Sequence, residues 1–255
     1  MAQVSVYPDA ARLADAAADY IATLAAQSIA GRGRFTLALS GGGTPRPVYE
    51  RLAAPALSAR IDWTRTQLFF GDERCVPPED PRSNYAMVKE ALLERAPIPA
   101  ANVHRVRGED DPERAARGYE ALLERLFGRS ADGSPAEGFD LVLLGMGDNG
   151  HTASLFPGSA LLGETRRWVA ADDVEAVGMW RVTLTPPLIN SARHVAFLVS
   201  GAGKAQMLAR VLEGPRQPAL LPAQIVQPAR GELRWMVDAS AAARLSRALE
   251  GRGGR

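Results

Sequence analysis

The sequence predicts an α/β fold: a single domain with an open, mostly parallel sheet flanked by helices. The first observation behind this prediction is the alternation of short apolar runs with longer amphipathic stretches. The second is that four of the apolar runs end directly in glycine or in ionisable residues. The carboxyl ends of parallel strands meet at one edge of an open sheet, where such folds bind ligands. A length of 255 residues suits one domain of this kind.

The composition argues against several classes of protein. Thirty basic residues face 29 acidic ones, so a net charge of +1 gives no basis for binding nucleic acid or an acidic membrane. The single cysteine, Cys75, permits neither an internal disulfide nor a zinc site made of several cysteines. No apolar segment approaches the roughly 20 residues that span a bilayer, and no signal peptide is evident. We therefore expect a cytoplasmic protein.

The first half of the chain is expected to alternate strands and helices. Asp9 is placed to cap the first helix, and the glycines at 31 and 33 close it. One apolar face indicates an amphipathic helix over residues 112–127. In order, we expect a strand at 4–7, a helix to about Ser28, a strand at 35–39, a helix at 48–52, a strand at 66–70, a helix at 86–94, a short strand around 103–106 and the helix at 112–127.

The second half is expected to complete the sheet. Asp238 is placed to cap a final helix that runs through Leu249. In order, we expect strands at 139–144, 168–170, 180–185, 194–199 and 233–237, a brief helical turn at 153–158, a helical turn from Pro186, a helix at 205–212 and a short apolar element at 221–226. No linker divides the chain, so residues 1–250 are expected to form one domain and residues 251–255 a flexible tail.

A glycine-rich loop follows the strand at 35–39. It consists of Ser40, Gly41, Gly42, Gly43 and Thr44, and a proline then fits the first turn of a helix. Glycines let the backbone approach an anion, and free N–H groups at a helix start can donate to it. We interpret the loop as a phosphate cradle, with a tight structural turn as the alternative. It has neither the Gly-Lys-Ser/Thr of a nucleotide P-loop nor the spacing of the dinucleotide fingerprint.

Two further strand ends carry charged residues. Asp72, Glu73 and Arg74 follow the strand at 66–70, either as a solvated turn with an internal ion pair or as part of a site beside the glycine loop. Lys204 follows the strand at 194–199, at the start of a helix. Because a positive charge there opposes the helix macrodipole, a bound anion would compensate it. The alternative is that Lys204 is an ordinary surface lysine.

The stretch from 139 to 152 supplies the candidate base. An apolar strand breaks into three glycines interleaved with Asp148 and Asn149, and His151 follows. A histidine just past the carboxyl end of a buried parallel strand lies where open sheets bind ligands. We expect His104 to be a surface or structural residue and His194 to begin a strand. His151 is therefore the histidine best placed to act as a base near its reference pKa of about 6.5.

Together these motifs resemble the 6-phosphogluconolactonases, within the wider group of glucosamine-6-phosphate isomerase/deaminase-like proteins. The resemblance covers nearly the whole chain and rests on five blocks in the family order. They are residues 39–45, 70–74 with Ser83-Asn84-Tyr85 downstream, 144–158, 181–185 and 201–204. The resemblance implies a Rossmann-like sheet of the glucosamine-6-phosphate deaminase type, with no metal and no organic cofactor.

The resemblance also implies an activity: hydrolysis of 6-phospho-D-glucono-1,5-lactone to 6-phosphogluconate, the second step of the oxidative pentose phosphate pathway. We assign the catalytic base to His151. Asp72 either orients His151 or binds sugar hydroxyls. The substrate is expected to contact the glycine cradle, with the phosphate there, and also Arg74, Asn149, Arg181 and Lys204.

Other functions stay open at this level. A related isomerase or deaminase would combine the cradle with ring-opening carboxylates, but none lies between His151 and Glu164. A non-catalytic sugar-phosphate sensor would keep the cradle and lose the base. A serine hydrolase is disfavoured because the Gly-x-Ser-x-Gly elbow is missing. We expect a small-molecule lactone as the ligand, no nucleic acid or membrane partner, and a monomer or weak homodimer.

Overall fold

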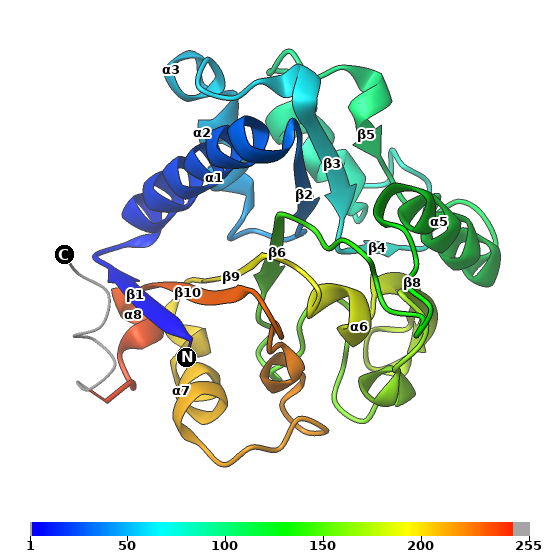
Figure 1. The fold of residues 1–255 in the computed structure, drawn as a ribbon. Helices are drawn as coiled ribbons and strands as arrows, with labels where there is room; N and C mark the ends of the chain where they lie inside the picture. The colour runs from blue at the N-terminus through cyan, green and yellow to red at the C-terminus, as the bar shows by residue number, and fades with distance from the viewer. Residues whose placement is uncertain (1, 247–255) are drawn as a thin grey trace.

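A seven-stranded parallel sheet forms the centre of the computed structural model, which describes residues 2–246 (Figure 1). The strand order is β1-β10-β9-β6-β2-β3-β5, and every pairing is parallel. The strands are β1 (Gln3–Tyr7), β2 (Phe35–Leu39), β3 (Thr66–Phe70), β5 (Val103–His104), β6 (Leu141–Gly145), β9 (His194–Val199) and β10 (Glu232–Asp238). The predicted open, mostly parallel sheet is therefore confirmed.

Helices cover both faces of the sheet, and Figure 1 shows α1 and α7 on opposite sides of β1 and β10. Asp9 caps α1 by accepting a hydrogen bond from the Arg12 N–H, and Gly33 ends it with a φ of +77°. The helices are α1 (Ala10–Arg32), α2 (Arg46–Ala53), α3 (Pro55–Ser58), α4 (Asn84–Val88), α5 (Pro112–Phe127), α6 (Pro186–Ile189), α7 (Ala205–Glu213) and α8 (Ala239–Ala242). None of the described helices is long and apolar enough to cross a membrane.

A second, three-stranded antiparallel sheet was not predicted. It has the order β4-β8-β7 and contains β4 (Asp72–Arg74), β7 (Val169–Val174) and β8 (Met179–Leu184). The charged residues after β3 were expected to form a turn, but they are a strand that pairs with β8. The chain continues almost directly from β3 into this sheet, so the second sheet lies against the carboxyl edge of the first. Helix α5 packs against β7 and β8.

Three local predictions are corrected. Residues 153–158 form no helix: Leu155 N–H bonds back to the Thr152 carbonyl at 2.9 Å, and Ala153 has a φ of +47°. The helix expected at 86–94 is α4 followed by a π-helical turn at Lys89–Leu93. The last helix ends at Ala242 instead of continuing, and Leu249 and the expected tail at 251–255 lie outside the described residues.

Candidate active site

The site lies where the strand order of the large sheet reverses direction. From β2 the chain proceeds to β3 and β5 on one side, whereas from β6 it proceeds to β9 and β10 on the other. Strands β2 and β6 are neighbours, so the loops that follow them separate and leave a crevice at their carboxyl ends. Open α/β sheets bind ligands at this kind of switch point. The glycine loop and the His151 loop are the two that diverge here.

A cavity of about 250 Å³ occupies this crevice. All four predicted strand ends contribute to it, and every predicted site residue except Asn149 lines it. The lining includes Ser40, Gly41, Gly42, Gly43, Thr44, Asp72, Arg74, His151, Arg181 and Lys204. Among the lining residues Asp72 is the single carboxylate, whereas Arg74, Arg181 and Lys204 are cationic. The cavity therefore suits an anionic ligand.

The glycine loop presents unused backbone donors. Within the described residues, no hydrogen bond is formed by the N–H groups of Gly42, Gly43 or Thr44. Gly42 has a φ of +100°, which is open to glycine at little cost. The loop is fixed at its start by Tyr49, whose hydroxyl donates to the Ser40 carbonyl at 2.7 Å and accepts from the Ser40 N–H at 2.9 Å. These groups can cradle an anion because helix α2 begins directly behind them.

The unpredicted strand β4 places two arginines side by side. Arg74 in β4 pairs with Arg181 in β8, and Asp72 pairs with Thr183. Since side chains alternate along a strand, Asp72 and Arg74 share the face toward the cavity and Glu73 points the other way. Arg181 is distant from Arg74 in the sequence, and the antiparallel pairing of β4 with β8 places it beside Arg74 at the cavity.

Glu73 is a buried structural carboxylate that the sequence did not identify. It accepts hydrogen bonds from the N–H groups of Arg74, Asn84 and Tyr85 at 2.7–2.8 Å and from the Ser83 hydroxyl at 3.0 Å. Burial nevertheless raises its pKa above the usual range of a glutamate. Glu73 thereby fastens the start of α4 to the second sheet. The Ser83-Asn84-Tyr85 block was the sequence signal that could have pointed to it.

Asn84 joins Asp72 to the glycine loop. Its amide Nδ2 donates to the Asp72 carbonyl at 2.9 Å and to the Asp72 carboxylate at 3.1 Å. A Cβ at Gly41 would lie 1.8 Å from Asn84 Oδ1, so glycine is the residue that fits there. Asn84 lines the cavity and was not among the predicted site residues.

Several polar atoms around the cavity have no hydrogen-bond partner. They are Arg74 Nε, Arg181 Nε and Asn84 Oδ1, all buried. Arg181 Nη1 lies 3.8 Å from Asp72 Oδ2, too far for a hydrogen bond, and burial lowers the Arg181 pKa. Buried polar groups in proteins are usually satisfied, so their concentration at one cavity is typical of a functional site.

Asp72 makes no hydrogen bond to His151. Its carboxylate accepts from the Ser154 hydroxyl at 2.7 Å as well as from Asn84. The influence of Asp72 on His151 is electrostatic: the negative charge raises the His151 pKa against the larger effect of burial. The structure thus shows no direct hydrogen bond by which Asp72 would orient the imidazole, and both predicted roles of Asp72 stay predictions.

A tight glycine loop holds the His151 ring. The ring stacks on Phe156 with centroids 4.1 Å apart. A Cβ on Gly147 would lie 2.1 Å from His151 Cε1 and Nδ1, so glycine is needed here for the ring to keep this position. Gly150 supports the loop with a φ of +82°. Burial is the main cause that lowers the His151 pKa, to about 4, so the imidazole is neutral at physiological pH.

Asn149 contacts His151 and lies outside the cavity lining, and its substrate contact stays a prediction. Its Oδ1 is 2.6 Å from His151 Nδ1 and also accepts from the His151 backbone N–H at 3.2 Å. Because the backbone group can only donate, the oxygen of the amide faces His151. Nδ1 therefore carries the proton, and Nε2 keeps the lone pair that a base needs.

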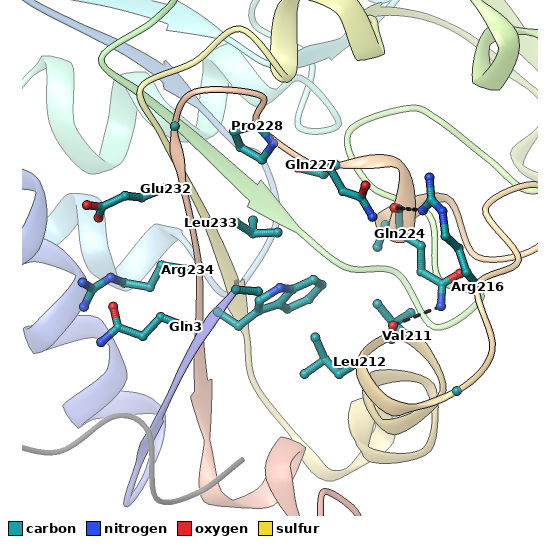
Figure 2. A pocket seen from close by; sticks show the side chains of 16 residues that line it. Gln3, Val211, Leu212, Arg216, Gln224, Gln227, Pro228, Glu232, Leu233 and Arg234 are labelled. Atoms are coloured by element: carbon teal, nitrogen blue, oxygen red, sulfur yellow. Dashed lines mark hydrogen bonds between the residues drawn. The ribbon is translucent and has the colours of Figure 1, made fainter. Parts of the chain in front are cut away.

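A larger cavity of about 750 Å³ lies between β10 and α7 (Figure 2). None of the predicted site residues lines it. Two of its polar side chains hold the loop after α7: Arg216 donates to the Gln224 carbonyl, and Gln224 donates to the Val211 carbonyl, as Figure 2 shows. Its lining contains Glu232 and Arg234 but no histidine and no glycine-rich loop, so we place the site at the sheet edge.

The remaining reactive side chains lie elsewhere. His104 stacks on Phe69 and contacts Gln67 Oε1 at 2.7 Å, which is the structural role expected of it. His194 begins β9, at the opposite end of the sheet. Burial raises the Cys75 pKa to about 11, so its thiol is protonated at neutral pH. Among the described residues, no group of three or more histidine, cysteine or acidic side chains is placed to hold a metal ion.

Comparisons with known proteins agree with this geometry. A family model described as glucosamine-6-phosphate isomerases/6-phosphogluconolactonase matches residues 8–235. The chain is 42% identical to a 6-phosphogluconolactonase of Nostoc sp. over 244 residues, which cover 95% of this chain and 98% of that protein. A 6-phosphogluconolactonase of Synechocystis sp. is also 42% identical, over 94% of this chain and 96% of the relative.

Solved structures give the same result. The 6-phosphogluconolactonase of Trypanosoma brucei superposes with a TM-score of 0.85 at 30% identity, covering 96% of this chain and 99% of that chain. A monomeric glucosamine-6-phosphate deaminase superposes with a TM-score of 0.77 at 22% identity, covering 95% of this chain and 99% of that one, which shows a shared fold. The chain therefore belongs to the glucosamine-6-phosphate isomerase/6-phosphogluconolactonase family.

Proposed function

We propose that this protein hydrolyses 6-phospho-D-glucono-1,5-lactone to 6-phospho-D-gluconate, with His151 activating the attacking water and the glycine loop binding the phosphate. The observation that carries the proposal is a neutral histidine, with Nε2 free, in the same small cavity as a glycine cradle and three cations. The names of the relatives with 42% identity support the same substrate.

The base assignment is supported by the state of the imidazole. At neutral pH His151 is unprotonated because its pKa is lowered to about 4. Burial lowers this pKa most, Asp72 raises it, and the positive charges of Arg181 and Lys204 lower it further. A bound phosphate would offset these two positive charges and so favour the imidazolium when the substrate is present. The stacked Phe156 ring and the Asn149 contact limit the rotation of the imidazole, which reduces the cost of bringing it to the water.

Phosphate binding at the cradle is supported by the surrounding charges. Arg74 and Arg181 are cross-strand neighbours, and their Nε groups lack partners among the described residues. An arginine can grip phosphate with two parallel hydrogen bonds, whereas Lys204 acts as a point charge. With the phosphate held there, the far end of the lactone would extend toward His151.

The reaction then follows in two steps. Water attacks the C1 carbonyl while His151 Nε2 takes its proton, which gives a tetrahedral oxyanion. The oxyanion collapses, the bond between C1 and the ring oxygen breaks, and His151 returns the proton to that oxygen. The products are a carboxyl group at C1 and a free hydroxyl at C5. Asp72 is the single carboxylate of the lining and stabilises the imidazolium by charge.

The cavity offers little support for the two alternatives. Ring opening in a deaminase would need a further carboxylate beside the histidine. Glu164 instead accepts from the backbone N–H groups of Thr165, Arg166 and Arg167, and it does not line the cavity. A sensor would have no need of a neutral histidine oriented by Asn149. A cytoplasmic location and a monomer or weak homodimer stay predictions.

The test is hydrolysis of freshly generated 6-phosphogluconolactone, with EDTA present and the spontaneous rate subtracted. We expect wild type to exceed background clearly and His151→Ala to lose about 10²–10⁴-fold in kcat, the usual contribution of a general base. His194→Gln is the matched control, because this histidine lies at the other end of the sheet, and it should retain activity.

Two outcomes would contradict the proposal. A folded His151→Ala variant that keeps most of its activity would remove the base assignment. A wild-type rate equal to background would remove the reaction itself. Glucosamine-6-phosphate deamination and then binding of sugar phosphates without turnover would be the next assays.

A further inference from the structure

An ion pair links the His151 loop to the start of α7. Lys204 Nζ lies 2.5 Å from Asp148 Oδ1. Asp148 belongs to the loop after β6, and Lys204 to the turn after β9, so two neighbouring strands bring the pair to the same edge. The Asp148 side chain is 83% exposed, whereas that of Lys204 is 25% exposed. The lysine thus lies partly inside the site, while its partner lies at the rim.

The two members of the pair differ in their relation to the cavity. Lys204 lines the cavity, and Asp148 does not. Lys204 is also the N-cap residue of α7, where its positive charge opposes the helix dipole. The sequence suggested that a bound anion would offset this charge, but in the structure the Asp148 carboxylate does so. An anion in the cavity would therefore meet an ammonium group that is already paired.

We propose that Asp148 sets the affinity of the site for phosphorylated ligands by competing with phosphate for Lys204. This inference rests on the proposed phosphate role of the cradle. Asp148 is a positioning residue, since it acts through Lys204 and lines no part of the cavity. Phosphate carries a charge of about −1.5 to −2 near neutral pH, so it competes well against a carboxylate of charge −1.

The consequence is weaker retention of phosphorylated molecules, including the product. With Asp148 present, part of the attraction of Lys204 for phosphate is offset, and the ammonium regains a partner when phosphate leaves. A singly charged or neutral sugar ligand attracts the Lys204 ammonium less strongly than phosphate does, so it displaces Asp148 less readily. The pair therefore favours a doubly charged group at this position and weakens the binding of the product.

The experiment is calorimetric titration of the whole protein with inorganic phosphate and with 6-phosphogluconate, which needs no turnover. Asp148→Asn is expected to lower both dissociation constants by about two- to fivefold, the range of exposed ion pairs. The gain should shrink at high ionic strength, because exposed charges are screened. Asp19→Asn is the matched control: Asp19 forms an exposed pair with Arg60 at 2.6 Å, has the same charge change and should alter neither constant.

A double-mutant cycle with Lys204→Ala separates the possible causes. We expect Lys204→Ala to weaken phosphate binding, and Asp148→Asn to have no further effect in that background. An equal gain in both backgrounds would show direct repulsion of the ligand by Asp148 and would overturn the inference. An unchanged dissociation constant in Asp148→Asn would also overturn it.

The failure of the proposed function is recognised separately. If Lys204→Ala leaves phosphate binding intact, the phosphate role of Lys204 is wrong, and the inference falls with it. If wild type binds 6-phosphogluconate but does not hydrolyse the lactone, the proposed reaction is wrong, whereas the competition between Asp148 and phosphate can still be measured.

Discussion

Two buried aspartates at opposite edges of the large sheet have different surroundings. Asp140 lies at the amino edge, where it accepts from the Thr36 N–H at 2.8 Å, from the Thr36 hydroxyl at 3.0 Å and from Arg32. Asp72 lies at the carboxyl edge and accepts from Ser154 and Asn84, while Arg181 Nη1 stays 3.8 Å away.

The two aspartates differ in whether the polar groups around them all have hydrogen-bond partners. At Asp140 the contacts tie together β2, the start of β6 and the end of α1, which is a structural arrangement. At Asp72 the neighbouring Arg74, Arg181 and Asn84 each keep a buried polar atom without a partner. Aspartate and arginine thus stabilise the fold at the amino edge, whereas at the carboxyl edge they leave polar atoms available to bind a ligand. Substitutions at the two edges should separate stability from activity.

The largest effect on stability is expected for Asp140→Asn. The amide removes the charge that faces Arg32 and Arg193, and it cannot accept every hydrogen bond that the carboxylate accepts. We expect a loss of about 3 kcal/mol in the free energy of unfolding, measured by urea denaturation, because charge-assisted hydrogen bonds are removed. The kcat/KM of the folded enzyme should be unchanged. A loss of activity without a loss of stability in Asp140→Asn would contradict the structural role that we assign to Asp140.

The next effect is expected for Gly147→Ala, which acts on the carboxyl edge. The new Cβ would lie 2.1 Å from two atoms of the His151 ring, so the imidazole must move. A displacement of about 1 Å can cost 10²-fold in rate, and we expect a loss of kcat of about that size. Gly163→Ala is the control, since its Cβ would have open space. A fully active Gly147→Ala enzyme would argue against His151 as the base.

Asp72→Asn provides the direct counterpart to Asp140→Asn. We expect kcat/KM to fall by about 10–100-fold, because charge-assisted interactions are worth about 1.5–3 kcal/mol. The free energy of unfolding should change by less than about 1 kcal/mol, since Asp72 accepts from the neutral side chains of Ser154 and Asn84 and, unlike Asp140, makes no hydrogen bond to an arginine. Lactonase assays and urea denaturation of the same preparation give both values. If Asp72→Asn is as destabilising as Asp140→Asn, the two edges do not differ as described.

The smallest effect is expected in the pH dependence of His151. Its folded pKa is lowered to about 4, so the imidazole stays unprotonated from neutral pH down to about pH 5 and takes up a proton only below that. Imidazole NMR signals, assigned by comparison with His151→Ala, should show no titration of His151 between pH 8 and 5. Titration near the reference value of about 6.5 would mean that burial is less effective than the cavity suggests.

The sequence predicted the elements that depend on local pattern. Strands β2 and β3 have the expected bounds because their apolar runs are buried and end in distinct polar residues. Helix α5 also has the expected bounds, since Asp111 caps it and Gly128 ends it. The helical turn expected at 153–158 was wrong because local propensity was overruled: Thr152 donates to the Gly145 carbonyl, and Ser154 bonds to Asp72 and Thr183.

The sequence by itself determined the parallel sheet, the four polar strand ends and the position of His151 directly after one of them, because each follows from periodicity and from the residues that interrupt it. Only the tertiary structure decided that β4 pairs with β8, that Asn149 orients His151, and that Asp148 holds Lys204. These contacts depend on the register between strands that are distant in sequence and on the directions in which loop side chains point. No periodicity in the sequence encodes either of them.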